Sequence, residues 1–245
     1  MTALDIAIAR KGYPGRDGAP PRTVLRDLAL SVEEGAFVCV LGPSGCGKTT
    51  LLNLIGGLDP DFEGQIHSAG HHGGARRVGY VFQEPVLLPW RTVGENLRLV
   101  MTPARIAAGI DLSLLDAMGL SDYRDAFPKS LSLGMSRRVA LARAFVVEPH
   151  LLLMDEPFVS IDEGTAEGLR QLLLRTWRAT STTVLFVTHD SREAVELAQR
   201  IVVLAGNPAR IVLDRKIELS AAQRADPREI DAVRRQILST NKDHS

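Results

Sequence analysis

A glycine-rich stretch that ends in a lysine and a threonine is the strongest chemical signal in the chain. Residues 42–49 read GPSGCGKT and match the pattern G-x-x-x-x-G-K-[ST]. The glycines let the backbone curl so that successive N–H groups point at phosphate oxygens, while Lys48 adds a positive charge and Thr49 offers a hydroxyl to Mg²⁺. An apolar run over 36–41 precedes the stretch, and an apolar helical run over 51–55 follows it. The pattern therefore predicts a triphosphate-binding loop between a strand and a helix.

Two acids end a second apolar run. Residues 151–154 read LLLM and are followed directly by Asp155 and Glu156. A carboxylate at the end of a buried strand is suited to hold Mg²⁺, directly or through water, and the next residue can face an attacking water. We expect Asp155 to be the metal ligand and Glu156 the general base. The alternative is a solvated strand end without a function.

A histidine and a glutamine follow two further strand signals. His189 comes after the apolar run 183–187, and its imidazole could contact a γ-phosphate and help to hold the water. Gln83 follows the short run 78–82, and its amide oxygen could reach the metal or the water. Taken alone, a structural histidine and an ordinary loop glutamine are the alternatives.

The elements that must position these residues alternate along the chain. The runs 36–41, 151–154 and 183–187 lack period-two alternation, which is typical of buried parallel strands. Helical spacing appears between them, so the sequence predicts an α/β fold with a parallel sheet. The stretch 87–148 has no strong strand signal and is expected to be a helical insertion, with a helix beginning at about Ser136.

The two ends of the chain carry different patterns. Apolar residues alternate with others from Leu4 to Ile8, which predicts a strand, and the turn-rich stretch 14–21 is expected to be a loop between two strands. Near the other end, Asp226 and the proline after it look like the start of a helix within a tail over about 220–240. Its apolar face predicts docking on the core, and the alternative is a regulatory or partner-binding role.

Composition limits the class of protein. The chain has 245 residues, which fits a single domain over 1–245. Lys and Arg number 29, as do Asp and Glu, so the zero net charge gives no reason to expect a nucleic-acid partner. The composition is 45% hydrophobic and 24% charged, as in a globular protein, and no apolar run is long enough to cross a bilayer.

Cysteine and histidine spacing indicates neither a zinc site nor a disulfide framework. Cys39 and Cys46 are expected to be reduced thiols, because no partner pair or nearby histidine has a metal-binding spacing. His67, His71 and His72 fall in or beside a glycine-rich turn, and a solvated loop is the favoured interpretation over a metal cluster. The start of the chain lacks the apolar stretch of a signal peptide, so we expect the protein to stay in the cytosol.

In this order the motifs resemble those of the ATP-binding subunit of ABC transporters, over about residues 4–215. The matching motifs are Walker A at 42–49, the Q-loop at Gln83, a signature at Ser132, Walker B ending in Asp155 and Glu156, a D-loop at 160–162 and the switch histidine His189. The resemblance implies a P-loop ATPase core with a parallel sheet, an N-terminal antiparallel β subdomain and an inserted α-helical subdomain at about 87–148. It also implies hydrolysis of ATP to ADP and phosphate with Mg²⁺.

The resemblance assigns roles to individual residues. The expected catalytic residues are Lys48, Gln83, Glu156 and His189, and the expected metal ligands are Thr49, Gln83 and Asp155. The expected nucleotide contacts are Tyr13, Gly42, Pro43, Ser44, Gly45, Cys46, Gly47, Lys48, Thr49 and Thr50, with Ser132 and Gly134 acting across a dimer. Tyr13 would stack on adenine, and its alternative is a core tyrosine.

A branch of the family is indicated by residues 82–93, FQEPVLLPWRTV, which are similar to importers of nitrate, taurine and aliphatic sulfonates. The resemblance implies a second ATPase subunit, identical or different, transmembrane permease subunits, and a periplasmic or extracellular solute-binding protein. It places the subunit on the cytoplasmic side of the inner membrane. Leu88, Trp90 and Arg91 would form part of a permease-docking groove, unless Leu88 and Trp90 are buried. An exporter subunit and a non-transport ABC-type ATPase are the alternatives.

The signature departs from the family pattern at one position. Residues 131–135 read LSLGM, where the family most often has LSGGQ or LSGGM, so Leu133 replaces a glycine. A leucine adds bulk beside the nucleotide and resists any backbone conformation that needs a positive φ. Slower hydrolysis, or pairing with a second ATPase that carries the glycine, are the two hypotheses that it raises.

We expect the Leu133→Gly variant to hydrolyse ATP faster than the unmodified chain, because the substitution removes that bulk. ATP turnover of the purified chain with and without the substitution measures the effect. Equal rates would mean that the leucine is tolerated and that the crowding argument is wrong.

Overall fold

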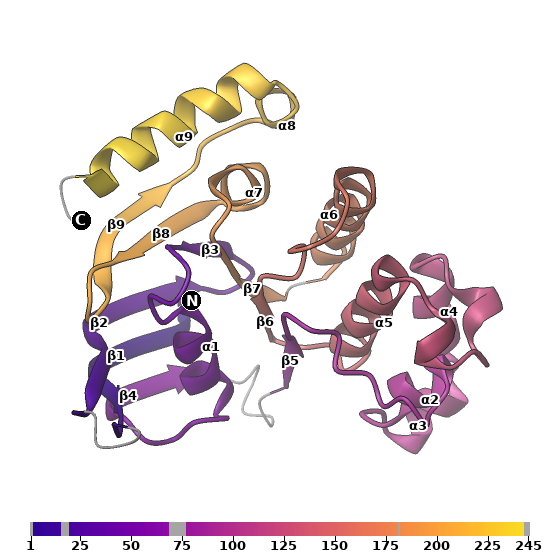
Figure 1. The fold of residues 1–245 in the computed structure, drawn as a ribbon. Coiled ribbons are helices and arrows are strands. Elements are labelled where there is room, and N and C mark those ends of the chain that lie inside the picture. The colour runs from indigo at the N-terminus through magenta and orange to yellow at the C-terminus, as the bar shows by residue number, and fades with distance from the viewer. Residues whose placement is uncertain (1, 16–19, 69–76, 181, 243–245) are drawn as a thin grey trace. The chain divides into compact units, whose positions relative to one another are not determined.

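The computed structural model describes residues 2–15, 20–68, 77–180 and 182–242, with the backbone alone for 240–242. The chain divides into two compact units, the first made of residues 1–69 and 183–245 and the second of residues 70–182. Both units combine strands with helices (Figure 1). The predicted α/β fold class is confirmed.

A three-stranded antiparallel sheet opens the first unit. It contains β1 (Thr2–Tyr13), β2 (Arg22–Glu33) and β4 (Glu63–Ser68) in the order β2-β1-β4. Leu4, Ile6 and Ile8 of β1 are buried while their neighbours in the strand are more exposed, as the alternation predicted. The stretch 14–21 connects β1 to β2, although residues 16–19 lie outside the described part of the chain.

The other strands of the first unit run in the order β7-β3-β8-β9. These strands are β3 (Phe37–Leu41), β7 (Thr183–Thr188), β8 (Arg200–Ala205) and β9 (Arg210–Lys216). β3 is parallel to both β7 and β8, whereas β9 is antiparallel to β8. Every residue of β3 and β7 is buried, which explains why their sequences are continuous apolar runs.

The described residues of the first unit also form four helices: α1 (Lys48–Gly56), α7 (Ser191–Leu197), α8 (Ala221–Arg224) and α9 (Pro227–Lys242). α9 lies against β9 and α7 (Figure 1). Asp226 Oδ1 accepts the N–H of Arg228, so the predicted start of this helix is confirmed. Ile230 and Ile237 are buried, as the predicted apolar face requires.

The second unit pairs two parallel strands with a group of helices. The strands are β5 (Val78–Val81) and β6 (Leu151–Asp155). The helices are α2 (Val93–Arg98), α3 (Pro103–Ala107), α4 (Ile110–Ala117), α5 (Leu133–Phe145) and α6 (Glu163–Arg178), with 3₁₀ turns at Ser121–Tyr123 and Pro128–Ser130. Across all described residues, none of the helices combines the length and the apolar character needed to cross a bilayer.

One helix begins earlier than the sequence suggested. α5 starts at Leu133 rather than near Ser136, because the side chain of Ser132 accepts the N–H of Met135 and caps the helix at that point. Leu133 is therefore a helical residue and is not among the residues with positive φ. The expected conflict between a leucine and a positive φ at this position therefore does not arise. Leu133 can affect a bound nucleotide only through the bulk of its side chain, which is 46% exposed.

A buried lysine joins β1 to the segment that follows α1. Lys11 is 2% exposed, and its Nζ donates to Asp59 Oδ1 at 2.9 Å and to the carbonyl oxygen of Asp61 at 2.5 Å. The Lys11 hydrogen bond is the main cause that lowers the pKa of Asp59. The ion pair therefore contributes its full stabilisation at pH values above the ordinary pKa of an aspartate. This contribution is lost as the pH falls through the lowered pKa of Asp59.

We expect Asp59→Ala to lower the free energy of unfolding by about 1–3 kcal/mol, because it removes the carboxylate partner of the buried Lys11 ammonium. Urea unfolding at neutral pH measures the change. Asp61→Ala is the matched control and should stay within about 0.5 kcal/mol, since only the backbone carbonyl of Asp61 binds Lys11. Equal unfolding midpoints for the two variants would contradict the role given to this ion pair.

Candidate functional site: a phosphate loop and the ends of parallel strands

The phosphate loop turns strand β3 into helix α1 through glycines that other residues could not replace. Gly45 has φ 76° and Gly47 has φ 107°, both in the left-handed region. A Cβ on Gly47 would lie 2.7 Å from Val24 Cγ1 and 2.8 Å from Leu25 Cδ2. A Cβ on Gly42 would lie 2.8 Å from the carbonyl oxygen of Leu204. The loop can take this path only with glycine at positions 42 and 47.

Lys48 lies inside this curl. The residue is 4% exposed, and its Nζ donates to the carbonyl oxygens of Gly42 at 2.9 Å and Pro43 at 3.0 Å. Helix α1 starts at Lys48 with no side-chain cap from the described residues and no acid in its first turn. Helix N–H groups without a cap, next to an ammonium, fit an anionic phosphate. Ser44 and Thr49 are exposed, so their hydroxyls are accessible.

His189 and the phosphate loop leave neighbouring strands at the same end. Leu41 of β3 is in register with Thr188 of the parallel strand β7, and Gly42 and His189 are the next residues. His189 is exposed, whereas Thr188 is buried and donates from Oγ1 to Glu193 Oε2 at 2.7 Å. The structure thus brings together two of the predicted site elements of the first unit.

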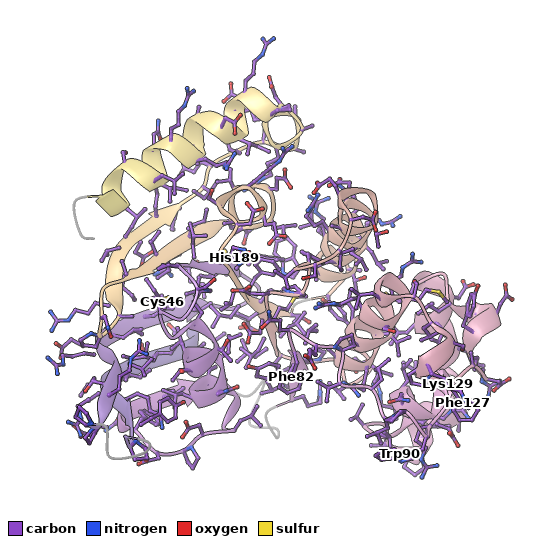
Figure 2. The ribbon with its side chains drawn as sticks, viewed as in Figure 1. Cys46, Phe82, Trp90, Phe127, Lys129 and His189 are labelled. Carbon is purple, nitrogen blue, oxygen red and sulfur yellow. The ribbon has the colours of Figure 1, made fainter. Side chains whose placement is uncertain are left out.

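The two cysteines of the chain are not joined by a disulfide in the structure. Cys39 is buried in β3, and burial is the main cause that raises the pKa of its thiol. Cys46 is partly exposed within the phosphate loop (Figure 2). His67 contacts Gln65 in β4, while His71 and His72 lie outside the described residues.

The second unit repeats the same arrangement with its own pair of strands. Val81 of β5 is in register with Met154 of β6, so Asp155, the last residue of β6, and Gln83, two residues after β5, belong to the same end of this strand pair. Asp155 is 4% exposed, and burial together with the charge of Asp155 raises the pKa of Tyr80. Carboxylate and amide oxygens at one edge are donors that suit Mg²⁺.

Glu156 has an unusual backbone. Its φ is 43°, in the left-handed region, and its carbonyl oxygen accepts the N–H of Val159 at 3.3 Å. This conformation costs a residue other than glycine about 1–3 kcal/mol, and such costs concentrate at functional sites. The side chain is half-buried directly after the end of β6. The position is compatible with a general base.

The signature segment presents a helix start to solvent. Ser132 is exposed, and its hydroxyl accepts the N–H of Met135 at 3.2 Å. Gly134 is buried, and a Cβ there would lie 2.6 Å from Thr165 Cγ2 of α6. Glycine at this position therefore lets α5 approach α6 closely, while the exposed Ser132 remains accessible.

Comparison with known proteins supports the same assignment. The ABC transporter family model matches residues 25–159. The aliphatic sulfonates import ATP-binding protein SsuB 2 of Burkholderia cenocepacia (strain HI2424) is 44% identical over 231 residues, which cover 92% of this chain and 82% of that protein. The corresponding SsuB of Bacillus subtilis (strain 168) is 37% identical over 243 residues, covering 97% and 93%. The chain belongs to the ABC transporter family. The prediction of an ABC-type ATPase that binds ATP is confirmed.

A solved structure of the ABC family is also similar. The dimeric ATP-binding cassette MJ0796, in a post-hydrolysis state bound to ADP and Pi, superposes with a TM-score of 0.75 and 29% identity. The match covers 89% of this chain and all of that one. The fold of this chain is therefore that of an ABC cassette.

The ABC resemblance also gave Tyr13 a role, and the structure places this residue at the end of β1. Tyr13 is 39% exposed, so the alternative of a core tyrosine was wrong. Its hydroxyl donates to Asp59 Oδ2 at 3.0 Å, and Lys11 Nζ lies 4.5 Å from the ring centroid. Both contacts fix the orientation of an accessible aromatic ring.

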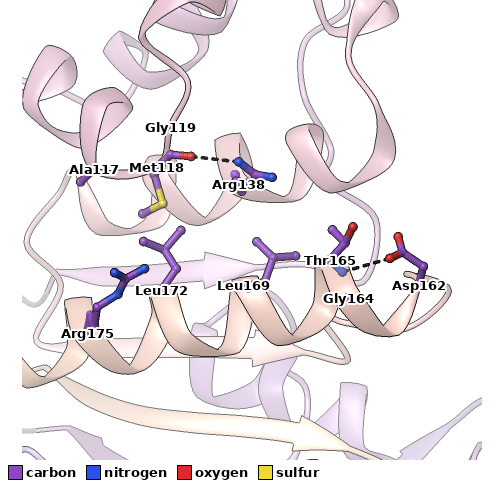
Figure 3. Close-up of a pocket in the computed structure, with 11 residues that line it drawn as sticks. Ala117, Met118, Gly119, Arg138, Asp162, Gly164, Thr165, Leu169, Leu172 and Arg175 are labelled. Atoms are coloured by element: carbon purple, nitrogen blue, oxygen red, sulfur yellow. Dashed lines mark hydrogen bonds between the residues drawn. The ribbon is translucent and has the colours of Figure 1, made fainter.

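The D-loop borders a pocket in the second unit. Asp162 caps α6 by accepting the N–H of Thr165 at 3.0 Å, and Ser160 before it has φ 61°. The pocket has a volume of about 500 Å³ and lies between α6 and the end of α4 (Figure 3). Arg138 and Arg175 line it together with Leu169 and Leu172.

Sequence reasoning missed two residues that shape the Q-loop region. Arg143 of α5 donates to the carbonyl oxygens of Pro85 at 3.1 Å and Val86 at 2.9 Å, and Val86 has φ 44°. Asn96 of α2 is fully buried and binds the backbone of Leu88 through both ends of its amide. In the sequence, Arg143 and Asn96 are each a polar residue within a helical stretch, and that pattern does not identify their backbone partners.

The segment held by Asn96 leaves Trp90 at the surface. Trp90 is 68% exposed in the second unit (Figure 2), while Leu88 is half-buried. The alternative in which both side chains are buried was therefore wrong. Arg91 is exposed and pairs with Glu95 at 3.4 Å.

We expect Gly47→Ala to reduce ATP affinity by about tenfold or more, because the new methyl group meets Val24 and Leu25 in a backbone conformation that costs about 1–3 kcal/mol. Calorimetric titration with ATP measures the loss. Gly168→Ala in α6 is the control, since a Cβ there has no atom within 4 Å. Unchanged affinity of Gly47→Ala would contradict the phosphate-loop assignment.

Proposed function

We propose that the protein is the ATP-hydrolysing subunit of a bacterial ABC importer. The ATPase part of the proposal rests on the buried Lys48 ammonium at the start of α1, which no side chain of the described residues caps. The names of the similar proteins, which are aliphatic sulfonate import proteins, support import over export. An aliphatic sulfonate is the favoured solute, ahead of taurine or nitrate.

The roles of individual residues follow from their chemistry. Lys48 and the backbone N–H groups of 42–50 bind the β- and γ-phosphates, Thr49, Asp155 and Gln83 supply oxygen ligands to Mg²⁺, and Tyr13 stacks on adenine. When bound, Mg²⁺ neutralises charge on the phosphate oxygens. Glu156 accepts a proton from the attacking water, and His189 holds that water and the γ-phosphoryl group in line.

A second ATPase subunit completes the proposed reaction. The exposed Ser132 hydroxyl and the start of α5 meet the γ-phosphate that the other subunit binds, as a helix N-terminus can do. The dimeric state of the similar cassette MJ0796 supports this pairing. We favour two identical copies, and a different second subunit is the alternative that Leu133 keeps open.

The remaining partners lie at the membrane. Transmembrane permease subunits bind the helical part of the second unit, at about 87–148, where Leu88, Trp90 and Arg91 form the proposed docking surface. The large exposed area of Trp90 supports this surface, because aromatic and arginine side chains are enriched in protein interfaces. A periplasmic or extracellular protein delivers the solute, and the ATPase is peripheral on the cytoplasmic side of the inner membrane.

We expect Glu156→Gln to keep ATP binding and to lower turnover by at least ~10²–10⁴-fold, as loss of a general base does. The variant should also accumulate as an ATP-bound dimer, which size-exclusion chromatography detects. Glu218→Gln, an exposed glutamate far along the chain from these motifs, should retain normal turnover. Near-normal turnover of Glu156→Gln would remove Glu156 from this role.

A further inference from the structure

Helix α7 is a short helix that follows the switch histidine directly. It spans Ser191–Leu197, and Asp190 caps it by accepting the N–H of Arg192 at 2.7 Å. Isolated helices of this length are not stable in water, so the position of α7 depends on what packs against it. Because one residue separates His189 from the helix, the position of α7 determines that of the histidine backbone.

The C-terminal segment holds the end of this helix. Arg224, the last residue of α8, donates to the carbonyl oxygens of Val195, of Glu196 at 3.2 Å and of Ala198 at 2.8 Å. These carbonyls are among those that a helix leaves without an internal partner at its C-terminus, where a positive charge is also favourable. One guanidinium group therefore satisfies three carbonyls at the end of α7.

Arg224 is itself held in place. A capping box joins Ser220 and Gln223 at the start of α8, and the Arg224 guanidinium also donates to the carbonyl oxygens of Ile217 and Leu219, both at 3.3 Å. The side chain thus connects the segment between β9 and α8 with the end of α7. Hydrogen bonds on both sides fix the position of the guanidinium group.

The start of α7 is held by α9. Arg234 Nε donates to the hydroxyl oxygen of Ser191 at 3.1 Å, and Ser191 is almost completely buried. Arg234 is oriented in turn by Asp231 at 2.7 Å. Ile230 and Ile237 anchor α9 through their buried side chains. Arg224 and Arg234 therefore contact the C-terminal end and the start of α7, respectively.

The connection continues from α7 to His189. Glu193 of α7 accepts the hydroxyl of Thr188, and Thr188 Oγ1 accepts the N–H of Asp190 at 3.0 Å. Thr188 and Asp190, the residues on either side of His189 in the chain, are therefore both hydrogen-bonded to α7. A shift of α7 would therefore move the imidazole relative to strand β7.

We infer that residues 221–242 form a positioning element for His189, with Arg224 and Arg234 as its positioning residues. The segment sets the ATP hydrolysis rate by fixing α7, without contacting the nucleotide. The inference rests on the role given to His189 under the proposed function. It assigns to the C-terminal helices a catalytic contribution beyond docking on the core.

The test compares Arg224→Gln with the unmodified full-length chain. We expect kcat to fall about tenfold, because the end of α7, and with it the backbone of His189, loses its fixed position, while KM and calorimetric ATP affinity stay within about twofold. Arg224→Lys should recover part of the rate, because an ammonium still donates to the carbonyls. Arg235→Gln on α9 is the matched control: its side chain is exposed, and it should hydrolyse ATP normally.

Each outcome decides the inference. Unchanged kcat in Arg224→Gln, or a loss of ATP affinity as large as the loss of rate, overturns it. If Arg224→Gln does not fold, Arg234→Gln decides by the same measurements, with Arg235→Gln again as the control. If His189→Ala retains the normal rate, both the role of His189 and this inference fail while the ATPase assignment stands. An unmodified chain without turnover would instead reject the proposed function.

Discussion

The buried ammonium group of Lys48 is the feature on which the site depends. An ammonium inside a protein is costly unless it has hydrogen-bond partners, and here the partners are carbonyl oxygens of the loop that precedes it. That loop can turn its carbonyls inward only because Gly47 adopts φ 107° against Val24 and Leu25. The same turn leaves the start of α1 without a side-chain cap from the described residues. The buried charge of Lys48, the backbone turn at Gly47 and the N–H groups at the start of α1 therefore depend on one another.

Both units use the same structural rule to place chemistry. In parallel strands the carboxyl ends share an edge, so residues that follow neighbouring strands lie near one another. Gly42 and His189 follow β3 and β7 in the first unit, and in the second unit Gln83 lies just after β5 while Asp155 is the last residue of β6. The fold thus concentrates polar groups at strand ends while the strands themselves remain apolar and buried. The rate of ATP hydrolysis can then depend on elements that do not belong to the site, such as the C-terminal helices with Arg224 and Arg234.

Much of this arrangement could be predicted from the sequence. β3, β6 and β7 are recognisable because strands buried on both faces need continuous apolar residues, and the phosphate loop has a fixed spacing. The start of α5 was missed because the Ser132 cap is not followed by the acid of a capping box. Arg143 and Arg224 could not be predicted, because their partners are backbone carbonyls that no residue pattern identifies. Their identification required the tertiary structure.

Calorimetric titration of ATP into the Lys48→Ala chain and the unmodified chain tests the role of the buried ammonium most directly. If the phosphate loop binds the triphosphate through Lys48, the unmodified chain binds ATP and the variant loses most of that affinity, while Lys129→Ala, at an exposed position, binds normally. Equal affinity of Lys48→Ala and the unmodified chain would contradict the central claim.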